Sequence, residues 1–267
     1  MNKLLIIDGH NYLYRSYYGI PSSAKLPNGL QVNAYYGFLS LLRKTYKYVK
    51  PSNIIIIFDS ETGTEEKINE NSKYKQNRDY SDTRMFEQLP IIKQALNFIN
   101  ISYIEHPNYE ADDVIGSIAK KESVDSKVYI SSQDKDFFQL IDKSILVLRT
   151  EKGKIVEYDN NEFERQYGFN SNRYLEYISL LGDPSDNIKG VKGIGKKTAF
   201  KIISEQRNVL KDINNPLLLR NLDLVRQNTE FLRIDCVLVL EYIFSVFSKE
   251  KLLMNSNEIL KKLNIYD

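Results

Sequence analysis

The residues of this chain that could do chemistry are mainly carboxylates at the ends of predicted strands and helices. The stretch SSQDKDF places Asp134 and Asp136 one residue apart, directly after an apolar run. Carboxylates gathered in a fold repel one another unless cations neutralise them. With one cysteine and two histidines in the whole chain, an excess of oxygen ligands favours Mg²⁺ or Mn²⁺ over zinc. Two such ions about 3.5–4 Å apart could activate a water and stabilise the leaving oxygen in a phosphoryl displacement.

Each candidate ligand also has an ordinary structural explanation. The candidates are Asp8, Asp59, Glu110, Asp112, Asp113, Asp134, Asp136, Asp183 and Asp186. Acids in the first turn of a helix interact with its dipole, which would explain those at 110–113. Aspartates also cap helices and build turns, which would explain Asp134, Asp183 and Asp186. These explanations suffice for single residues, but they weaken for the whole set if its members meet at one edge of a sheet.

The elements that must position these acids follow an α/β pattern. Three runs rich in isoleucine and valine, at 4–8, 54–59 and 128–134, each end in aspartate. Their continuous apolar character predicts strands buried on both faces of a parallel sheet. Helical patterns lie between them, at 34–48, 89–99 and 110–121. In such an α/β fold, ligands bind beyond the carboxyl ends of the strands, which is where the three aspartates fall.

Residues 61–88 break this pattern. The segment is polar, mixed in charge and too long for an ordinary connection, so we expect it to be either mobile or functional. Its Lys75 and Arg78 could offset charge developing on a scissile phosphate, or they could be solvated loop charges beside nearby acids. After a soft boundary near Gly168 the strand signals fade, and helices are predicted as far as the region 217–247.

A basic patch follows the GDPSDN motif directly. From 188 to 204 the chain carries five lysines and no acid, although the net charge of the whole chain is only +2. The glycines allow close backbone approach, and the helix expected from Lys196 offers unpaired N–H groups to a phosphate. These features fit a grip on a DNA backbone that does not depend on base sequence. The alternative is a plain helix-turn-helix with a solvated lysine face.

Composition excludes several other classes. The 267 residues are 42% hydrophobic and 27% charged, which is ordinary for a globular protein with its own core. Cys236 is the only cysteine, so no disulfide can form within the chain, and a reducing compartment is expected. The first apolar run is too short for a signal peptide and no run is long enough to span a bilayer, so we expect a cytosolic protein.

Taken in order, these motifs resemble a known family. IDGHNYLYRSYYGIP, FDS, YKQNR, EADDVIGSIA, SSQDKDFFQL and GDPSDNIKGVKGIGKKTA are similar to the 5′ nuclease domain of bacterial DNA polymerase I and to related phage and standalone flap endonucleases. The resemblance implies a PIN-like (resolvase-like) α/β domain with a parallel sheet over 1–168, with a helical arch within 61–88. It implies an all-helical DNA-binding domain over 169–267, with a helix-three-turn-helix at 183–203.

The resemblance also implies roles for single residues. The first metal cluster would be Asp8, Asp59, Glu110, Asp112 and Asp134, with Asp113 beside them. The second cluster would draw on Asp136, Asp183 and Asp186. The expected catalytic residues are Lys75, Arg78, Asp112 and Asp134. The expected DNA contacts are Tyr12, Arg15, Lys75, Arg78, Lys189, Lys192, Gly193, Gly195, Lys196, Lys197 and Thr198, although the rings after the first strand could equally pack in the core.

The implied activity is a 5′-3′ exonuclease and structure-specific flap endonuclease of DNA replication and repair, with two or more Mg²⁺ or Mn²⁺ ions. In relatives the glycine-rich turn also binds K⁺. The expected form is a bacterial or phage monomer in the cytoplasm, acting on 5′ ends, flaps and branched duplex, with a DNA polymerase in trans. One departure is TGTEEKI, where relatives commonly carry a TFR-like basic stretch. Two alternatives stay open: RNase H-like removal of RNA primers, and binding of DNA structures without cleavage.

Overall fold

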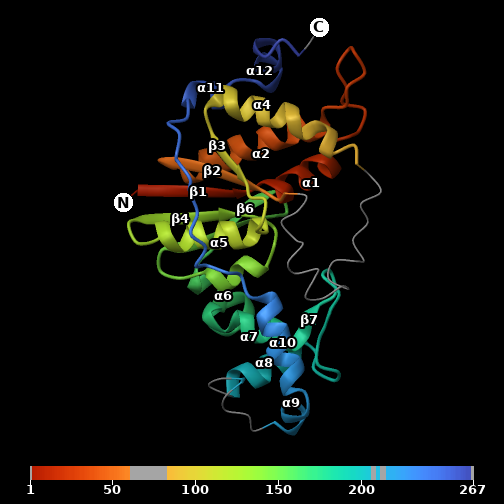
Figure 1. The fold of residues 1–267 in the computed structure, drawn as a ribbon, viewed down its shortest axis with the longest axis vertical. Helices are drawn as coiled ribbons and strands as arrows, with labels where there is room; N and C mark the ends of the chain where they lie inside the picture. Colours follow the sequence, from red (N-terminus) through yellow and green to blue (C-terminus); the bar gives the residue numbers. More distant parts are fainter. Residues whose placement is uncertain (1, 61–82, 206–208, 211–214, 266–267) are drawn as a thin grey trace.

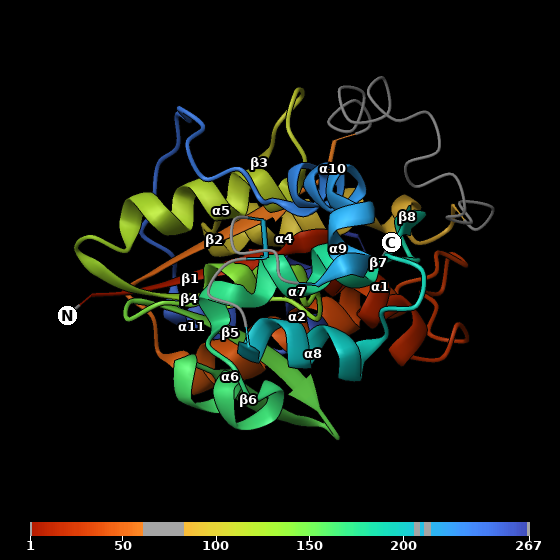
Figure 2. The ribbon, with the colours of Figure 1, turned by 90° about the horizontal axis from the view of Figure 1, so that it is seen from below.

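The computed structural model describes residues 2–60, 83–205, 209–210 and 215–265. A central sheet lies between helical layers, and a smaller helical part lies beyond one of these layers, on one face of the sheet (Figure 1). Seen from below, α7 (Tyr174–Leu181), α8 (Lys196–Glu205) and α10 (Leu222–Leu232) of this helical part lie in front of the sheet (Figure 2). No helix within the described ranges has the length and apolar character that crossing a membrane would need.

The sheet has six strands in the order β3-β2-β1-β4-β5-β6. Its members are β1 (Asn2–Asp8), β2 (Asn53–Phe58), β3 (Ser102–Glu105), β4 (Ser126–Ser131), β5 (Ile145–Glu151) and β6 (Lys154–Tyr158). All neighbours are parallel except β5 and β6. The three predicted strands are confirmed as β1, β2 and β4, whereas β3 and β5 were not predicted. Because Asp8 pairs with Ile57 and Ile7 pairs with Ser131, the carboxyl ends of these three strands meet at one edge.

Both faces of the sheet are covered by helices. Leu5 and Ile7 of β1 pack with α1 (Gly9–Gly19), α2 (Asn33–Val49) and α4 (Leu89–Ile99). Leu4 and Ile6 point to the other face and pack with α5 (Ala111–Glu122). The strands are therefore apolar throughout because each has two buried faces. The helices predicted at 34–48, 89–99 and 110–121 are confirmed, with ends shifted by at most one residue.

The helical part follows α6 (Asn160–Tyr167), which ends at Gly168 in the left-handed conformation. The next elements are α7 (Tyr174–Leu181), the short β-hairpin of β7 (Gly182–Asp183) and β8 (Ile188–Lys189), α8 (Lys196–Glu205), α9 (Pro216–Arg220) and α10 (Leu222–Leu232). Their buried residues belong to the same apolar cluster as α5 and one face of the sheet. The two parts of the molecule therefore share one continuous core.

The last part of the chain differs from the expectation of helices up to 247 in one domain over 169–267. After α10, residues 233–248 (the return segment) form neither helix nor strand and run back along α5. Leu238, Leu240 and Tyr242 pack inward while Val237 and Val239 are exposed, which is the period-two pattern of an extended chain. The terminal helices α11 (Lys249–Leu253) and α12 (Ser256–Lys262) then complete the core on the α2 and α4 side of the sheet.

Candidate metal and DNA-binding site

Asp8 forms the centre of the carboxyl edge. It ends β1 and is only 7% exposed. The backbone N–H of Asn11 donates to Asp8 Oδ1 over 2.9 Å, so the side chain caps α1, and Ser132 Oγ donates to Oδ2 over 2.6 Å. Burial raises the pKa of Asp8 to about 7, and the charges of Asp59 and Asp134 add to this effect, although both hydrogen bonds oppose it. A cation beside Asp8 would restore its charged form.

Asp59 is hydrogen bonded both to His10, which follows β1, and to the first residue of α5. It follows β2 directly, and its Oδ1 accepts a hydrogen bond from the N–H of Ala111 over 2.9 Å. Its own N–H donates to His10 Nδ1 over 2.9 Å, and burial lowers the pKa of this imidazole. Because Ala111 is the first residue of α5, this bond brings Glu110 and Asp112 to the same edge as Asp8.

Asp134 and Asp136 are connected to Asp8 by further hydrogen bonds. The N–H of Asp134 donates to Ser132 Oγ, and the N–H of Asp136 donates to Asp134 Oδ1, each over 2.9 Å. Asp134 is thus linked through Ser132 to Asp8. Asp136 begins the short 3₁₀ helix η2 (Asp136–Leu140), which turns it toward the helical part.

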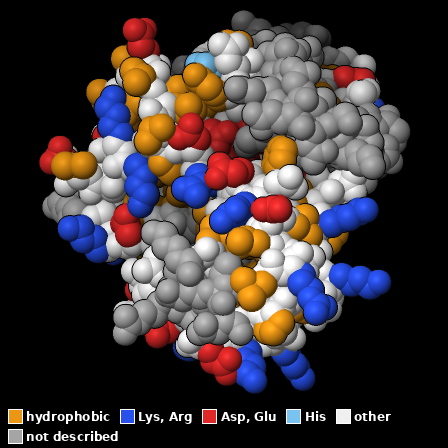
Figure 3. Space-filling model, turned by 60° about the horizontal axis from the view of Figure 1, so that its bottom comes forward, with side chains coloured by type: hydrophobic (Ala, Val, Ile, Leu, Met, Phe, Trp, Pro, Cys, Tyr) orange, Lys and Arg blue, Asp and Glu red, His pale blue; other side chains and the backbone are white. Residues whose placement is uncertain are grey.

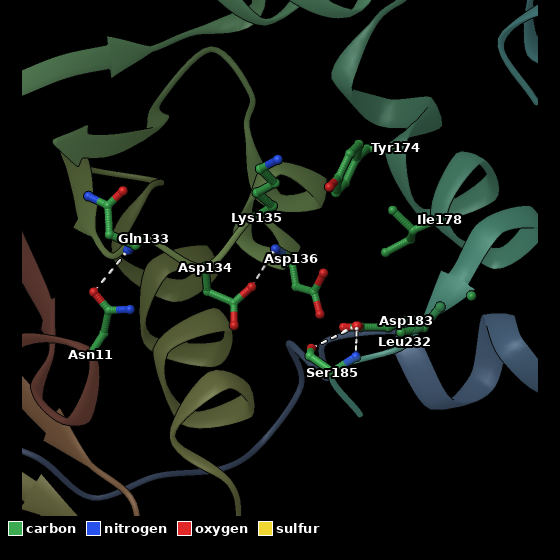
Figure 4. Close-up of a pocket in the computed structure, with 11 residues that line it drawn as sticks. Asn11, Gln133, Asp134, Lys135, Asp136, Tyr174, Ile178, Asp183, Ser185 and Leu232 are labelled. Carbon is green, nitrogen blue, oxygen red and sulfur yellow. Dashed lines mark hydrogen bonds between the residues drawn. The ribbon is translucent and has the colours of Figure 1, made fainter. Parts of the chain in front are cut away.

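Asp134 and Asp136 line a pocket of about 450 Å³ between the sheet edge and the β7–β8 hairpin. Asp183 faces them across this pocket, and its Oδ1 accepts hydrogen bonds from the N–H and the Oγ of Ser185, both at 2.7 Å (Figure 4). Tyr174 closes one side, and its pKa is raised by burial and then by neighbouring tyrosine and aspartate charges. Asp186 is buried in the hairpin turn but does not line the pocket.

The predicted ligands therefore fall into two groups, one around Asp8 and Asp59 and one around Asp136 and Asp183, with Asp134 between them. Among the described residues, no three carboxylate, imidazole or thiol groups converge closely enough to enclose an ion as they stand. The donor set still fits a hard cation, since it consists of carboxylate oxygens. The ligand set stays a prediction.

Two predicted site residues have other surroundings in the structure. Asp113 Oδ1 accepts a hydrogen bond from the N–H of Asp235 over 2.8 Å, so this carboxylate holds the return segment. Tyr12, predicted to contact DNA, is only 1% exposed, and its hydroxyl is hydrogen bonded to Thr45 Oγ1 and Ser131 Oγ. A ring buried in this way cannot stack on a base, so that prediction is wrong.

The predicted DNA contacts of the glycine–lysine turn lie at the surface. Lys189, Lys192, Gly193, Gly195, Lys196, Lys197 and Thr198 are exposed. Val191 and Ile194 anchor the turn in the core, and Gly193 has a φ of +90°, which favours glycine. The face drawn in Figure 3 carries acidic and basic side chains next to one another rather than a broad surface of one charge. Lys75 and Arg78 lie outside the described residues.

Ser132, His10 and Asn11 support the carboxylates, but none of them was predicted. Their position in the sequence could have identified them, because each stands within three residues of a predicted ligand in the motifs DGHN and SSQD. Partners of this kind orient ligands and tune their charge.

Comparison with protein-family models defines the class of the two parts. Residues 3–168 match a resolvase-like N-terminal domain of 5′-3′ exonucleases, and residues 169–236 match the C-terminal SAM fold of the same family. The chain belongs to the 5′-3′ exonuclease family.

Two curated relatives illustrate this membership. The chain is 34% identical over 219 residues to the 5′-3′ exonuclease of Aquifex aeolicus, with 80% of this chain and 73% of the relative covered. It is 37% identical over 208 residues to DNA polymerase I of Caldicellulosiruptor bescii, which covers 76% of this chain. The chain spans only 24% of the length of that polymerase.

Solved structures share the fold. The D15 protein of bacteriophage T5, co-crystallised with metal ions, has a TM-score of 0.72 at 19% identity, with 100% of both chains covered. The D15 flap endonuclease in a pseudo-enzyme-product complex with DNA and metal ions has a TM-score of 0.66 at 21% identity, with 88% of this chain and 90% of that chain covered. At these identities the likeness shows a common fold.

Proposed function

We propose that this protein is a divalent-metal-dependent 5′-3′ exonuclease and flap endonuclease that hydrolyses phosphodiester bonds in DNA. The observation that carries the proposal is the pocket that brings Asp134 and Asp136 opposite Asp183, a few residues before the lysine-rich turn. Mg²⁺ is the proposed ion, and Mn²⁺ would substitute for it. A neighbour of the same fold has been crystallised with DNA and metal ions, which supports both the substrate and the cofactor.

Each part of the site has a proposed task. Asp8, Asp59, Glu110, Asp112 and Asp134 would hold one ion, and Asp136, Asp183 and Asp186 would hold another. When bound, such ions lower the pKa of a bound water and stabilise the leaving oxygen. Ser132 and His10 fix the carboxylates, and the exposed lysines of the turn hold the backbone of duplex DNA. Lys75 and Arg78 are proposed to face the scissile phosphate.

The proposed setting is the cytoplasm of a bacterium or of a phage-infected cell. There the protein would act as a monomer on 5′ ends, flaps and branched duplex, with a DNA polymerase in trans. An RNA primer annealed to DNA is the competing substrate.

The test compares wild-type protein with Asp134→Asn and Asp125→Asn on a 5′-flap duplex in Mg²⁺. Asp134 follows β4 at the carboxyl edge, whereas Asp125 precedes β4 at the opposite edge and is exposed, which makes it a matched control. Loss of a ligand should reduce cleavage by more than the roughly 10–100-fold that outer partners contribute. Cleavage undiminished in Asp134→Asn would refute the assignment, and faster cleavage of an RNA–DNA hybrid would favour primer removal.

A further inference from the structure

We propose that a cationic strip beside the pocket binds the sugar-phosphate backbone of the DNA substrate and leads it from the carboxylates to the lysine-rich turn. The strip consists of Arg15, Lys135, Arg149 and Lys196. Lys135 and Arg149 are its new members, since the motifs of the family resemblance give them no role. The inference rests on the proposed function, because a phosphodiester backbone is a ligand here only if the protein acts on nucleic acid.

Arg149 lies on β5 at the level of Asp8 on β1, because Leu148 and Ile7 both pair with Ser131 of β4. Leu148 pairs with Ser131 of β4, and its carbonyl oxygen accepts a hydrogen bond from the N–H of Ser132 over 3.3 Å. Arg149 therefore lies at the carboxyl edge of the sheet, next to the Ser132–Gln133 turn. Its Cζ lies 5.4 Å from the centre of the Phe138 ring, which fixes the guanidinium over an apolar base.

Two hydrogen-bond donors at this place have no acceptor. Arg149 Nε and Gln133 Nε2 are both buried and make no hydrogen bond. The two side chains are neighbours, since Arg149 Nη2 lies 3.5 Å from Gln133 Oε1. Buried donors without partners are rare because they lose their bonds to water and gain nothing in return. A small shift of the two side chains would open these donors to an oxyanion, and a guanidinium binds phosphate oxygens in pairs.

Lys135 extends the positive charge along the rim of the pocket. Its side chain points away from the carboxylates of Asp134 and Asp136 on either side of it (Figure 4). It is exposed and stands two residues after Gln133, which contacts Arg149, and Lys135 and Gln133 line the same pocket. Arg149 and Lys196 are close enough for their charges to act on Lys135. Arg15 borders the same group, because it follows Asn11 by one turn of α1 and Asn11 Oδ1 accepts a hydrogen bond from the N–H of Gln133 over 3.0 Å. Lys196 is the first residue of α8 and connects the strip to the turn.

Among the described residues, these cations have no acidic counterion of the kind that surface lysines and arginines commonly have. In the part of the chain that the structure describes, no carboxylate forms an ion pair with any of the four. The nearby acid Glu151 accepts a hydrogen bond from the hydroxyl of Tyr158. Cations that repel one another and have no acidic partner attract a polyanion, and release of its counterions makes the binding dependent on salt.

The experiment measures the affinity for a labelled 5′-flap duplex by fluorescence anisotropy, in Ca²⁺ and over a series of salt concentrations. The variants are Lys135→Gln, Arg149→Gln and Arg149→Lys. Lys143→Gln is the control, since Lys143 is exposed and precedes β5 at the opposite edge. Each glutamine variant in the strip should weaken binding and reduce the slope of log K against log salt by about 0.9 for each duplex phosphate that the protein no longer neutralises. Arg149→Lys should keep the slope but bind less tightly, because lysine cannot reproduce the paired geometry.

The possible outcomes distinguish failure of the cationic strip from failure of the proposed function. A wild-type protein that neither binds nor cleaves flap DNA refutes the proposed function. A wild-type protein that does both, with an unchanged salt slope in Lys135→Gln, refutes the strip alone. Lys135 is exposed, so this variant stays informative if Arg149→Gln fails to fold. A lower melting temperature for Arg149→Gln with unchanged DNA affinity would show that Arg149 only packs on Phe138, and it too would refute the strip.

Discussion

Replacing Ile259 by alanine tests whether the terminal helices belong to the fold of the sheet. Ile259 of α12 is fully buried in the apolar cluster that includes α2 and α4, and Tyr35 of α2 donates a hydrogen bond to the carbonyl of Ser256 over 2.9 Å. Truncating a buried isoleucine to alanine costs about 2–5 kcal/mol of unfolding free energy. In a chain of this length 1 kcal/mol shifts Tm by roughly 2–4 °C, so Tm should fall by roughly 4–20 °C.

Thermal unfolding followed by far-UV circular dichroism measures this change. We expect one cooperative transition at a lower temperature, because the helices and the sheet share a core. Leu253→Ala is the control, since Leu253 of α11 is 47% exposed and its truncation should change the unfolding free energy by no more than about 0.5 kcal/mol. A small early step followed by a main transition at the wild-type Tm would refute the reasoning, because it would mean that α11 and α12 melt by themselves.

Three further predictions concern the carboxyl edge. Asp8 has a pKa of about 7 in the folded protein against about 3.9 in the unfolded chain, so the unfolded chain releases its proton first as pH rises. In EDTA, the free energy of unfolding should therefore fall as pH rises from about 4 to about 7. Asp8→Asn should abolish this dependence in urea titrations and stabilise the metal-free protein at pH 8 by at most about 4 kcal/mol; an unchanged pH profile would contradict the cause given. Ser132→Ala should lower Mg²⁺ affinity about 10–100-fold in calorimetric titrations, while Ser126→Ala at the other end of β4 should not. Tyr12→Phe should destabilise the fold by about 1–3 kcal/mol and leave DNA affinity unchanged, since the Tyr12 hydroxyl is hydrogen bonded to Thr45 and Ser131. Weaker DNA binding by this variant would support the prediction that Tyr12 contacts DNA.

The parts of the fold that could be predicted are those with long, continuous patterns. β1, β2 and β4 are apolar because both of their faces are buried, and α2, α4 and α5 each carry one apolar stripe. β3 has three half-buried residues and one exposed residue, and therefore almost no pattern of buried positions. The run ILVL of β5 does have the apolar character of its neighbours and could have been predicted. The sequence predicts helix for the return segment, because VLVLEYIF is apolar at seven of its eight positions and does not alternate; its inward face becomes evident only against α5.

The sequence predicts those site residues whose position follows from the end of a strand. Asp8, Asp59 and Asp134 gather because parallel strands deliver their carboxyl ends to one edge. Asp112 and Asp113 could not be distinguished by composition, since adjacent helical residues point about 100° apart and only the fold shows that Asp113 meets Asp235. The cations of Lys135 and Arg149 come together through a strand pairing that no local motif contains.

The path of the return segment has a consequence for how the protein is made. The core beneath α2 and α4 includes Phe247, Leu252, Ile259 and Leu260, so it stays open until these residues have left the ribosome. Ile234 packs directly against Gly116 of α5, since a Cβ at position 116 would lie 2.5 Å from Ile234 Cγ2. This contact also forms only after the return segment has been synthesised. Domains usually fold in the order of their synthesis, but here the first unit needs the last residues described. A nascent chain therefore carries the carboxylates of the sheet edge on an unfinished core, and this core closes only after the helical part has been synthesised.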